Sequence, residues 1–497
     1  MQRSKNIQNL SEIDQYTRGD SDFILSTFRR ILGRFNLNGI NRMLKPIKCK
    51  GIDVRHIFQV LFLMPFINLK NVHCLMQSGV SSEVNGSKDT YYRFMKDPNI
   101  PWRRILLAFA KQFQKIVKEN SEDKDGSITP KCLIIDDTVL DKAGLKIEMI
   151  GKVFDHCSHR FSLGIKLLLA GLWDGKNFIP LDFSLHNEPG KKQNRGLSSA
   201  QIKQQFSKNR HEDCPSYQRV EEVKQSKITI AMEMIERFVK QGFTFEYVLA
   251  DSWFISEGFI KSILDIKERR GLSIDLIGLM KSNRYVQING KVHLLSNLPE
   301  LKRAQIKFCK KLGCFYIPMN VRYKGIDLKI FLIRMKGQET WKVLISTNQS
   351  LSFINAMRIY QIRWSIEVFF KDAKQNLKLG KCQSIDLDAH IATISMACMN
   401  YTTLALAKRF EAYETIGHLF KNIKDQIIQE NIVKKIWQLM KEIYVRILAD
   451  FGMSWEYFLS QLAASCDFIN KIRNVCNIIL NFEESKLDWC SQANCET

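Results

Sequence analysis

The chain has 497 residues, 45% of them hydrophobic, and carries 74 Lys and Arg residues against 51 Asp and Glu residues. This length is too great for one compact core, so we expect two to four domains. The net charge of +23 favours a polyanionic partner, with nucleic acid as the first candidate. The alternative is a basic enzyme without such a partner.

The cysteines and the apolar runs exclude two further classes of protein. Thirteen cysteines are scattered along the chain without a C-x-x-C pair, which favours reduced thiols over a disulfide scaffold. The amino terminus, MQRSKNIQNLSEIDQ, lacks the apolar segment of a secretory signal. The longest apolar run, IFQVLFLMPFINL, is shorter than a membrane span of about 20 residues and predicts a buried helix. We therefore expect a soluble, intracellular protein.

Residues 1–125 are predicted to form a helical DNA-binding domain. The apolar spacing from residue 21 to 120 is helical, with one interruption at GVSSEVNGSKDT, which is rich in turn residues. The stretch SKDTYYRFMKDPNIPWRR then interleaves cations, among them Arg93, with aromatic residues. Such a stretch is typical of a DNA contact surface, but equally of a helix whose Tyr and Phe side chains pack in a core.

A mixed α/β sheet is predicted after the polar segment KENSEDKDGSITP. Its first strands are KCLIID, FSLGIKLLLAGLW and FIPLDFSLH, the last two joined by a turn at Asp174 and Gly175. The basic polar stretch 187–219 is too long for an ordinary connection and is predicted to be a mobile loop near the ligand. Helices around 226–241 and 256–270 then alternate with the strands FEYVLAD and SIDLIGLMK.

The rest of the chain divides into a β-rich and a helical part. Residues 284–348 are predicted to form a β-rich insertion, because YVQINGKVHLL contains an Asn-Gly hairpin turn and IDLKIFLIRMKG and TWKVLISTN have strand patterns. Beyond residue 375 the spacing is helical and ends in a polar tail. The predicted organisation is a catalytic domain over 126–385, containing the insertion, and a helical carboxy-terminal region over 386–497.

The stretch RIYQIRWSIEVFFKDAK, residues 358–374, has the most informative spacing in the chain. On one α-helix, with about 100° per residue, a single narrow face would hold four polar side chains: Tyr360, Arg363, Glu367 and Lys374. The apolar residues between them predict burial on nearly every other side. A solvated stripe is the alternative, but one acid, two cations and a phenol on a buried helix suit an anionic ligand and a metal ion better than bulk water.

Further carboxylates lie where a mixed sheet would present them to a ligand. Asp136 and Asp137 end the first predicted strand, and Asp251 ends the fourth. Ligands bind at the strand ends of open α/β sheets, although each acid alone would more often cap the following loop. If the helix with Glu367 packs across that edge, three carboxylates converge. Two Mg²⁺ ions need such a ligand set for in-line phosphoryl displacement, with the phosphates bound by the cations beside Glu367.

At this point the sequence resembles a known family. The segment YQIRWSIEVFFKDAK matches the Y..R...E......K signature of bacterial insertion-sequence DDE transposases at every signature position. The order Asp, Asp, β insertion, Glu is also similar to that family over about residues 130–385. The resemblance implies an α/β protein with a ribonuclease H-like mixed-sheet catalytic core and a β-rich insertion, flanked by amino-terminal and carboxy-terminal helical regions.

The resemblance also implies a catalytic and metal-binding set, which is Asp136, Asp251 and Glu367. These carboxylates would hold two Mg²⁺ ions, for which Mn²⁺ could substitute. The family pattern D-x-T selects Asp136 through Thr138, and Asp137 stays an alternative. An activated water would cut one strand at the end of the mobile element, and the freed 3′-hydroxyl would attack a second phosphodiester in the partner strand or the target.

The partners implied by the resemblance are double-stranded DNA, as terminal inverted repeats and target, and a second copy of the chain. A homodimer would hold two DNA ends through the carboxy-terminal helices, in the bacterial cytoplasm at the nucleoid. The DNA-binding candidates are Tyr360, Arg363, Lys374, Trp341 and Arg93. Trp341 lies in the insertion, where hairpin-forming relatives stabilise a flipped base, and its alternative role is packing in a strand.

Other functions fit the sequence less well. A metal-dependent nuclease or junction resolvase on the same fold needs the carboxylates but not the stripe of Tyr, Arg and Lys. A catalytically inactive, transposase-derived DNA-binding protein would be favoured by a missing carboxylate or a truncated insertion, and the sequence has neither. A small-molecule phosphatase would require neither the charge of +23 nor a large helical domain.

Overall fold

The computed structural model describes residues 38–410, apart from gaps at 48–49, 68, 79–80, 82–83, 121–128, 156–158 and 188–195, and a few residues outside this range. Residues 38–410 belong to one compact unit, which spans residues 28–422. A second unit combines residues 1–27 with 423–497 and lies almost wholly outside the description. Most of the predicted carboxy-terminal region lies there too, so its dimerisation and the predicted domain boundaries stay predictions.

Helices form the amino-terminal part of the described chain, as the apolar spacing predicts. Their bounds are α3 (Asn38–Leu44), α4 (Val54–Leu63), α5 (Val72–Met76), α6 (Lys88–Met95) and α7 (Trp102–Asn120). The longest apolar run begins in α4, whose start is capped by the Asp53 side chain accepting a hydrogen bond from the Arg55 amide. Seven residues of α4 are buried, which confirms the predicted buried helix.

None of the helices that the structure describes is long and apolar enough to cross a membrane.

The strands of the described region join in one sheet of twelve. Their bounds are β1 (Cys132–Asp141), β2 (Gly151–Asp155), β3 (Arg160–Trp173), β4 (Phe178–His186), β5 (Tyr247–Ala250), β6 (Asp275–Met280), β7 (Tyr285–Ile288), β8 (Lys291–Leu294), β9 (Lys307–Cys309), β10 (Cys314–Tyr323), β11 (Ile326–Met335) and β12 (Lys342–Ser346). Five of them carry the topology that positions the site, and the others extend the sheet.

The core of the sheet has the strand order β4-β3-β1-β5-β6. Strand β1 is antiparallel to β3 and parallel to β5, and β5 is parallel to β6. The two parallel connections run through α10 (Lys227–Lys240) and α11 (Glu257–Arg270), as predicted. A mixed sheet with three leading antiparallel strands and two following parallel ones is the ribonuclease H-like arrangement, so the predicted fold class is confirmed.

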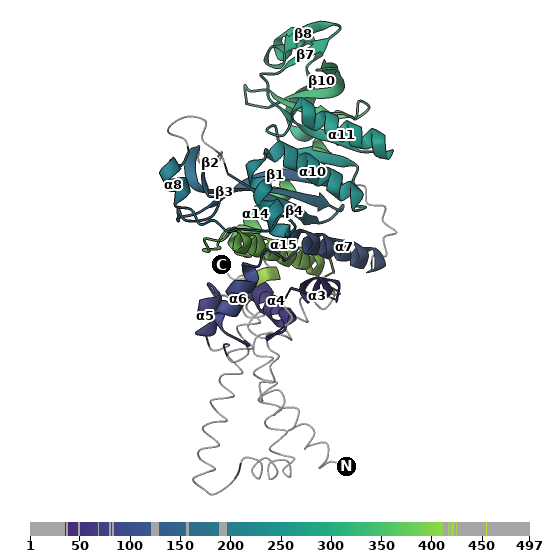
Figure 1. Cartoon of the computed structure of the whole chain (residues 1–497). Helices are drawn as coiled ribbons and strands as arrows, with labels where there is room; N and C mark the ends of the chain where they lie inside the picture. The colour runs from purple at the N-terminus through teal and green to yellow at the C-terminus, as the bar shows by residue number, and fades with distance from the viewer. Residues whose placement is uncertain are drawn as a thin grey trace, which may run out of the picture. The chain divides into compact units, whose positions relative to one another are not determined.

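The β-rich insertion continues this sheet beyond β6. Strand β12 pairs antiparallel with β6, and β11, β10, β7 and β8 follow in that order. Figure 1 shows β10, β7 and β8 at the far end of the insertion. The predicted turn at Asn289 and Gly290 joins β7 to β8, and both residues have positive φ. The short helix α12 (Leu298–Leu301) also lies here. Strand β10 was not predicted, because Pro318 and Asn320 interrupt its strand pattern.

The polar stretch 187–219 was predicted to be a mobile loop, and this is wrong for its described part, residues 196–219. That part contains α8 (Ser199–Lys203) and the start of α9 (Pro215–Lys224). Arg210 is buried and ion-pairs with Glu148 and Asp388. A buried cation requires such fixed partners, so the charges of this segment anchor it to the core.

Residues 358–374 do not form a single helix, contrary to the prediction. Helix α13 (Phe353–Gln361) ends before a turn at Ile362 and Arg363, and α14 (Trp364–Gln375) follows. Both turn residues keep αR dihedral angles, so the polar side chains still project together.

The predicted burial of this segment on nearly every side is also wrong. Trp364 is 62% exposed and Val368 is 40% exposed. Helix α14 packs with one face on β1, β4 and α15 (Leu387–Phe410), and the residues on that face are Ile366, Phe369, Phe370 and Ala373. The opposite face contacts solvent.

Candidate active site

Asp136 and Asp251 lie side by side at the point where two parallel strands stop pairing. The last pair of β1 with β5 is Ile135 with Ala250, and the two aspartates follow directly. The prediction that Asp251 follows the end of its strand is confirmed. The same prediction for Asp136 is wrong, because β1 continues to Asp141 through its pairing with the longer strand β3.

The backbone after Asp251 is fixed by a close contact with the neighbouring strand. A Cβ atom added at Gly278 of β6 would lie 2.5 Å from Ile255 Cδ1 and 2.9 Å from the Ala250 carbonyl oxygen. Only glycine allows this approach. Phe254 and Ile255 are buried, so the turn that begins at Asp251 is anchored at its far end.

Asp136 and Asp137 point to opposite faces of the sheet, because successive residues of a strand alternate. Asp136 accepts a hydrogen bond from Arg363 Nη1 at 2.7 Å, on the face covered by α14. Asp137 instead forms an ion pair with Lys227, the first residue of α10. Only the Asp136 carboxylate therefore lies on the face of the Tyr, Arg, Glu and Lys stretch.

Arg363 connects the two distant parts of the site. Its guanidinium donates to Asp136 Oδ2 at 2.7 Å and to Glu367 Oε1 at 2.6 Å, and these acids are 231 positions apart in the printed sequence, 367 minus 136. We call Asp136, Asp251 and Glu367, with Arg363 and Tyr360, the acid cluster. It holds three carboxylates against one guanidinium.

The electrostatics of the acid cluster reflect this surplus of carboxylates. Burial raises the pKa of Asp136 to about 7, and the neighbouring carboxylates of Asp137 and Asp251 add to the rise, while Arg363 opposes it. Among the described residues, Asp251 finds no hydrogen-bond or ion-pair partner for its carboxylate. The acid cluster thus contains two carboxyl groups that repel each other when both are ionised: Asp251, which has no described partner, and Asp136, whose ionisation burial opposes.

Tyr360 adds a donor without a partner to the cluster. Its hydroxyl is buried beside the Arg363 guanidinium, and in the described part of the chain no acceptor faces the hydroxyl proton. Burial raises the pKa of Tyr360 strongly, so the hydroxyl keeps its proton at neutral pH. A buried hydroxyl of this kind can donate to a phosphate oxygen that enters the site.

Lys374 of α14 forms hydrogen bonds with β1 beyond Asp136. Its Nζ donates to Thr138 Oγ1 at 2.7 Å and to the Val139 carbonyl oxygen at 3.0 Å. The fourth residue of the signature therefore reaches the strand that carries Asp136, two and three residues beyond it. This contact ties the end of α14 to β1.

The side chains fit a divalent cation in part. Asp136 and Asp251 supply neighbouring oxygen ligands whose charges repel each other, which a cation would relieve. Glu367 is held by Arg363, and the described residues contain no group of three His, Cys, Asp or Glu side chains that could hold a metal ion. The two aspartates fit a metal ion, and Glu367 reaches it only if Arg363 releases the carboxylate.

Among the described residues, two DNA-binding candidates, Trp341 and Arg93, make their contacts away from the acid cluster. Trp341 is partly buried directly before β12, and the Arg334 guanidinium lies 5.2 Å from the centre of its ring. Arg93 is exposed on α6 and donates to the Asp89 carbonyl oxygen. Their role in binding DNA stays a prediction.

The basic and aromatic stretch around Arg93 combines both of its interpretations. Tyr91 is fully buried, and its hydroxyl donates to the Asn85 carbonyl oxygen at 2.8 Å. Arg103 turns inward to Asp182 and Glu222. Arg93 and Arg104 are exposed. Internal contacts therefore hold Tyr91 and Arg103, whereas Arg93 and Arg104 face solvent.

Two residues that contact each other near Asp137 and Asp251 were missed by sequence reasoning, and Lys227 lies on the face of the sheet opposite the acid cluster. Trp253 is 38% exposed, and Lys227 Nζ lies 4.0 Å from the centre of its indole ring while also pairing with Asp137. The position of Trp253, two residues after Asp251, was a signal that could have found it. Lys227 lies 90 positions from Asp137, and no local pattern connects them.

Residues 69–293 match the family model described as DDE superfamily endonuclease. This segment is similar to DDE endonucleases, which generally use divalent metal ions, and it contains both Asp136 and Asp251. It covers less than half of the chain and ends before Glu367. A search of the curated proteins found no match.

Proposed function

We propose that the chain is a DNA transposase that cuts DNA at insertion-sequence ends and joins the freed 3′-hydroxyl to target DNA by phosphoryl transfer. The observation that carries this proposal is the meeting of Asp136 and Asp251 with Arg363 and Glu367 in one cluster. The similarity of residues 69–293 to DDE endonucleases and the net charge of +23 support it.

The proposed chemistry starts from the acid cluster. Asp136, Asp251 and Glu367 would hold Mg²⁺, or Mn²⁺ in its place, and such ions stabilise both the attacking and the leaving oxygens of an in-line displacement. Arg363 exchanges its carboxylate partners for phosphate oxygens when DNA enters, since a guanidinium binds either anion in the same forked geometry. The Tyr360 hydroxyl donates to the same phosphate.

Two displacements follow at one site. In the first, the oxygen of a water molecule attacks the phosphorus and the bond to the 3′ oxygen breaks, leaving a 3′-hydroxyl and a 5′-phosphate. In the second, this 3′-hydroxyl attacks another phosphodiester, and the displaced oxygen takes the proton. Lys374 keeps α14 and β1 in register through Thr138 and Val139, so that Glu367 and Asp136 stay on one side of the DNA. Two copies of the chain would hold the two DNA ends.

The test compares the full-length wild type with Asp251→Asn and with the matched surface change Asp265→Asn on α11. Each protein is incubated with Mg²⁺ and end DNA, and both nicked and joined products are measured. We expect Asp251→Asn to lose at least about 100-fold in both products and Asp265→Asn to lose nothing. Cleavage without joining would favour the nuclease or resolvase alternative. Equal activity of wild type and Asp251→Asn would remove the acid cluster from the mechanism.

A further inference from the structure

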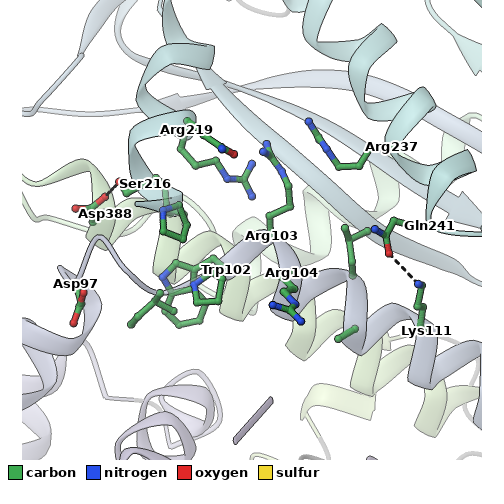
Figure 2. Close-up of a pocket in the computed structure, with 17 residues that line it drawn as sticks. Asp97, Trp102, Arg103, Arg104, Lys111, Ser216, Arg219, Arg237, Gln241 and Asp388 are labelled. Atoms are coloured by element: carbon green, nitrogen blue, oxygen red, sulfur yellow. Dashed lines mark hydrogen bonds between the residues drawn. The ribbon is translucent and has the colours of Figure 1, made fainter. Parts of the chain in front are cut away.

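A cavity lies away from the acid cluster. Its volume is ≈ 650 Å³, within the range of small-molecule sites, and α7, α9 and α10 supply most of its cationic lining (Figure 2). The donors and cations of its lining are Trp102, Arg103, Arg104, Lys111, Arg219 and Arg237. Two acids, Asp97 and Asp388, also line it, and Asp388 is paired with Lys208 and Arg210.

This cavity borders the other face of the sheet from the acid cluster. Asp182 of β4 pairs with Ala170 of β3, which in turn pairs with Ile135 of β1. Paired residues share a face, so Asp182 lies on the face of Ile135 and Asp136 on the opposite one. Arg103 of α7 and Arg237 of α10 bind Asp182. The cavity is therefore a separate site.

The cavity wall has a surplus of positive charge. Three guanidinium groups share two carboxylates, and we call these five residues the arginine cluster: Arg103, Arg219, Arg237, Asp182 and Glu222. Figure 2 shows the guanidinium groups of Arg103 and Arg219 next to each other. Burial, with Arg103 next in effect, lowers the pKa of Arg219 to about 10, as expected where cations outnumber acids.

Two buried donors of the wall have no acceptor in the described part of the chain. These are Nη2 of Arg219, whose side chain is 5% exposed, and Nε1 of Trp102, which is 3% exposed. Buried donors are almost always paired in native proteins, so two of them at one cavity indicate a missing acceptor. The exposed Arg104 adds a cation that no described acid neutralises.

We propose that this cavity binds the phosphate group of a nucleotide-sized ligand, with Arg219 and Trp102 as buried donors and Arg104 at the rim. An anion with several acceptor oxygens satisfies the donors and neutralises the surplus charge, and a guanidinium wall suits a phosphate in particular. The volume of the cavity accommodates the rest of a nucleotide, and the apolar part of its lining can contact the base. The ligand is either a free nucleotide or one nucleotide of a DNA strand.

Two variants test the site without removing the arginine cluster. Trp102→Phe deletes the Nε1 donor and keeps an aromatic ring against Phe94, which lies edge-on at 6.1 Å. Arg104→Gln removes the rim charge. Arg303→Gln, an equally exposed arginine of the insertion, is the matched control. Thermal unfolding of each protein verifies that the fold is kept.

The measurement is calorimetric titration of the full chain with inorganic phosphate, deoxyadenosine 5′-monophosphate and deoxyadenosine at low salt. We expect the two phosphates to bind, deoxyadenosine to bind at least tenfold more weakly, and Trp102→Phe and Arg104→Gln each to weaken phosphate binding about tenfold. Absence of phosphate binding, or equal binding by wild type and both variants, would overturn the proposal.

A competition experiment identifies the source of the phosphate. A short single-stranded oligonucleotide that is displaced from the wild type by deoxyadenosine 5′-monophosphate, and bound more weakly by Trp102→Phe, places a DNA nucleotide in the cavity. The other outcome is that the oligonucleotide does not compete with the mononucleotide and binds Trp102→Phe as well as the wild type, while the mononucleotide binds Trp102→Phe more weakly. This outcome assigns the cavity to a free nucleotide. The cavity site does not depend on DNA cleavage, so Asp251→Asn keeps full phosphate binding in either case.

Discussion

The acid cluster and the arginine cluster each hold an aspartate away from most solvent, with side chains 17% exposed at Asp136 and 0% exposed at Asp182, and the pKa of the two carboxyl groups shifts in opposite directions. Burial raises the pKa of Asp136 to about 7, and Arg363 only partly opposes this rise, to which the Asp137 and Asp251 carboxylates add. Burial also acts against the Asp182 carboxylate, but Arg103, Arg219 and Arg237 together lower its pKa to about 2. Burial opposes ionisation of both carboxyl groups, so the balance of neighbouring charges decides the direction of each pKa shift. The arginine cluster has enough cations to keep its aspartate ionised, and the acid cluster does not.

The opposite pKa shifts indicate different roles for the two aspartates: Asp182 stabilises the fold, and Asp136 does not. An aspartate surrounded by three fixed arginines is part of the fold, since its removal leaves buried cations unpaired. An aspartate beside other carboxylates weakens the fold, and the metal binding proposed above would relieve the repulsion between them.

The largest expected effect is on the free energy of unfolding, and it contrasts Asp182→Asn with Asp136→Asn. Asp182→Asn should lose about 3–5 kcal/mol, because three guanidinium groups lose a shared buried partner. Asp136→Asn should change by less than about 1 kcal/mol in either direction, because the lost pair with Arg363 is offset by lower repulsion from Asp251. Urea unfolding at neutral pH measures both. Equal losses in the two variants would contradict the comparison.

The residues of the acid cluster were predictable from two local patterns in the sequence, helical periodicity and the ends of apolar strands. Helical spacing places Tyr360, Arg363 and Glu367 together even though a turn interrupts the helix, because the turn keeps helical dihedral angles. The choice between Asp136 and Asp137 was open, because adjacent strand residues face opposite ways and only the register reveals which face α14 covers.

The arginine cluster was beyond sequence reasoning. Arg103 pairs with residues 79 and 119 positions away, and no local pattern specifies such contacts. The stretch around Arg103, in which cations alternate with aromatic residues, fitted a DNA contact surface and a packed helix equally well, and neither interpretation predicted its buried ion pairs. The exposure of Trp364 was missed for a related reason, because an apolar helix position does not reveal which side of the helix meets the core.

A smaller effect should appear when Mg²⁺ is added. If Mg²⁺ binds the folded acid cluster as proposed, then at ten times the dissociation constant it should stabilise the wild type by about 1.4 kcal/mol. Asp136→Asn and Asp251→Asn should gain much less, and Asp265→Asn should gain as much as the wild type. Thermal unfolding with MgCl₂ against NaCl of equal ionic strength measures this. A gain that is the same in NaCl would assign the effect to screening of the net charge.

The smallest expected effect is a pH dependence that belongs to the arginine cluster. The pKa of Asp182 is lowered from 3.8 to about 2 on folding, so its carboxylate stabilises the fold above pH 3.8, and this contribution is lost as the pH falls toward 2. The difference in unfolding free energy between wild type and Asp182→Asn should therefore shrink by about 1 kcal/mol between pH 5 and pH 3. Urea unfolding of both proteins at the two pH values measures it, and their difference cancels the titration of the other carboxylates. A difference that stays constant would mean that Asp182 is not held ionised by its arginines, and the contrast with Asp136 would then rest on packing alone.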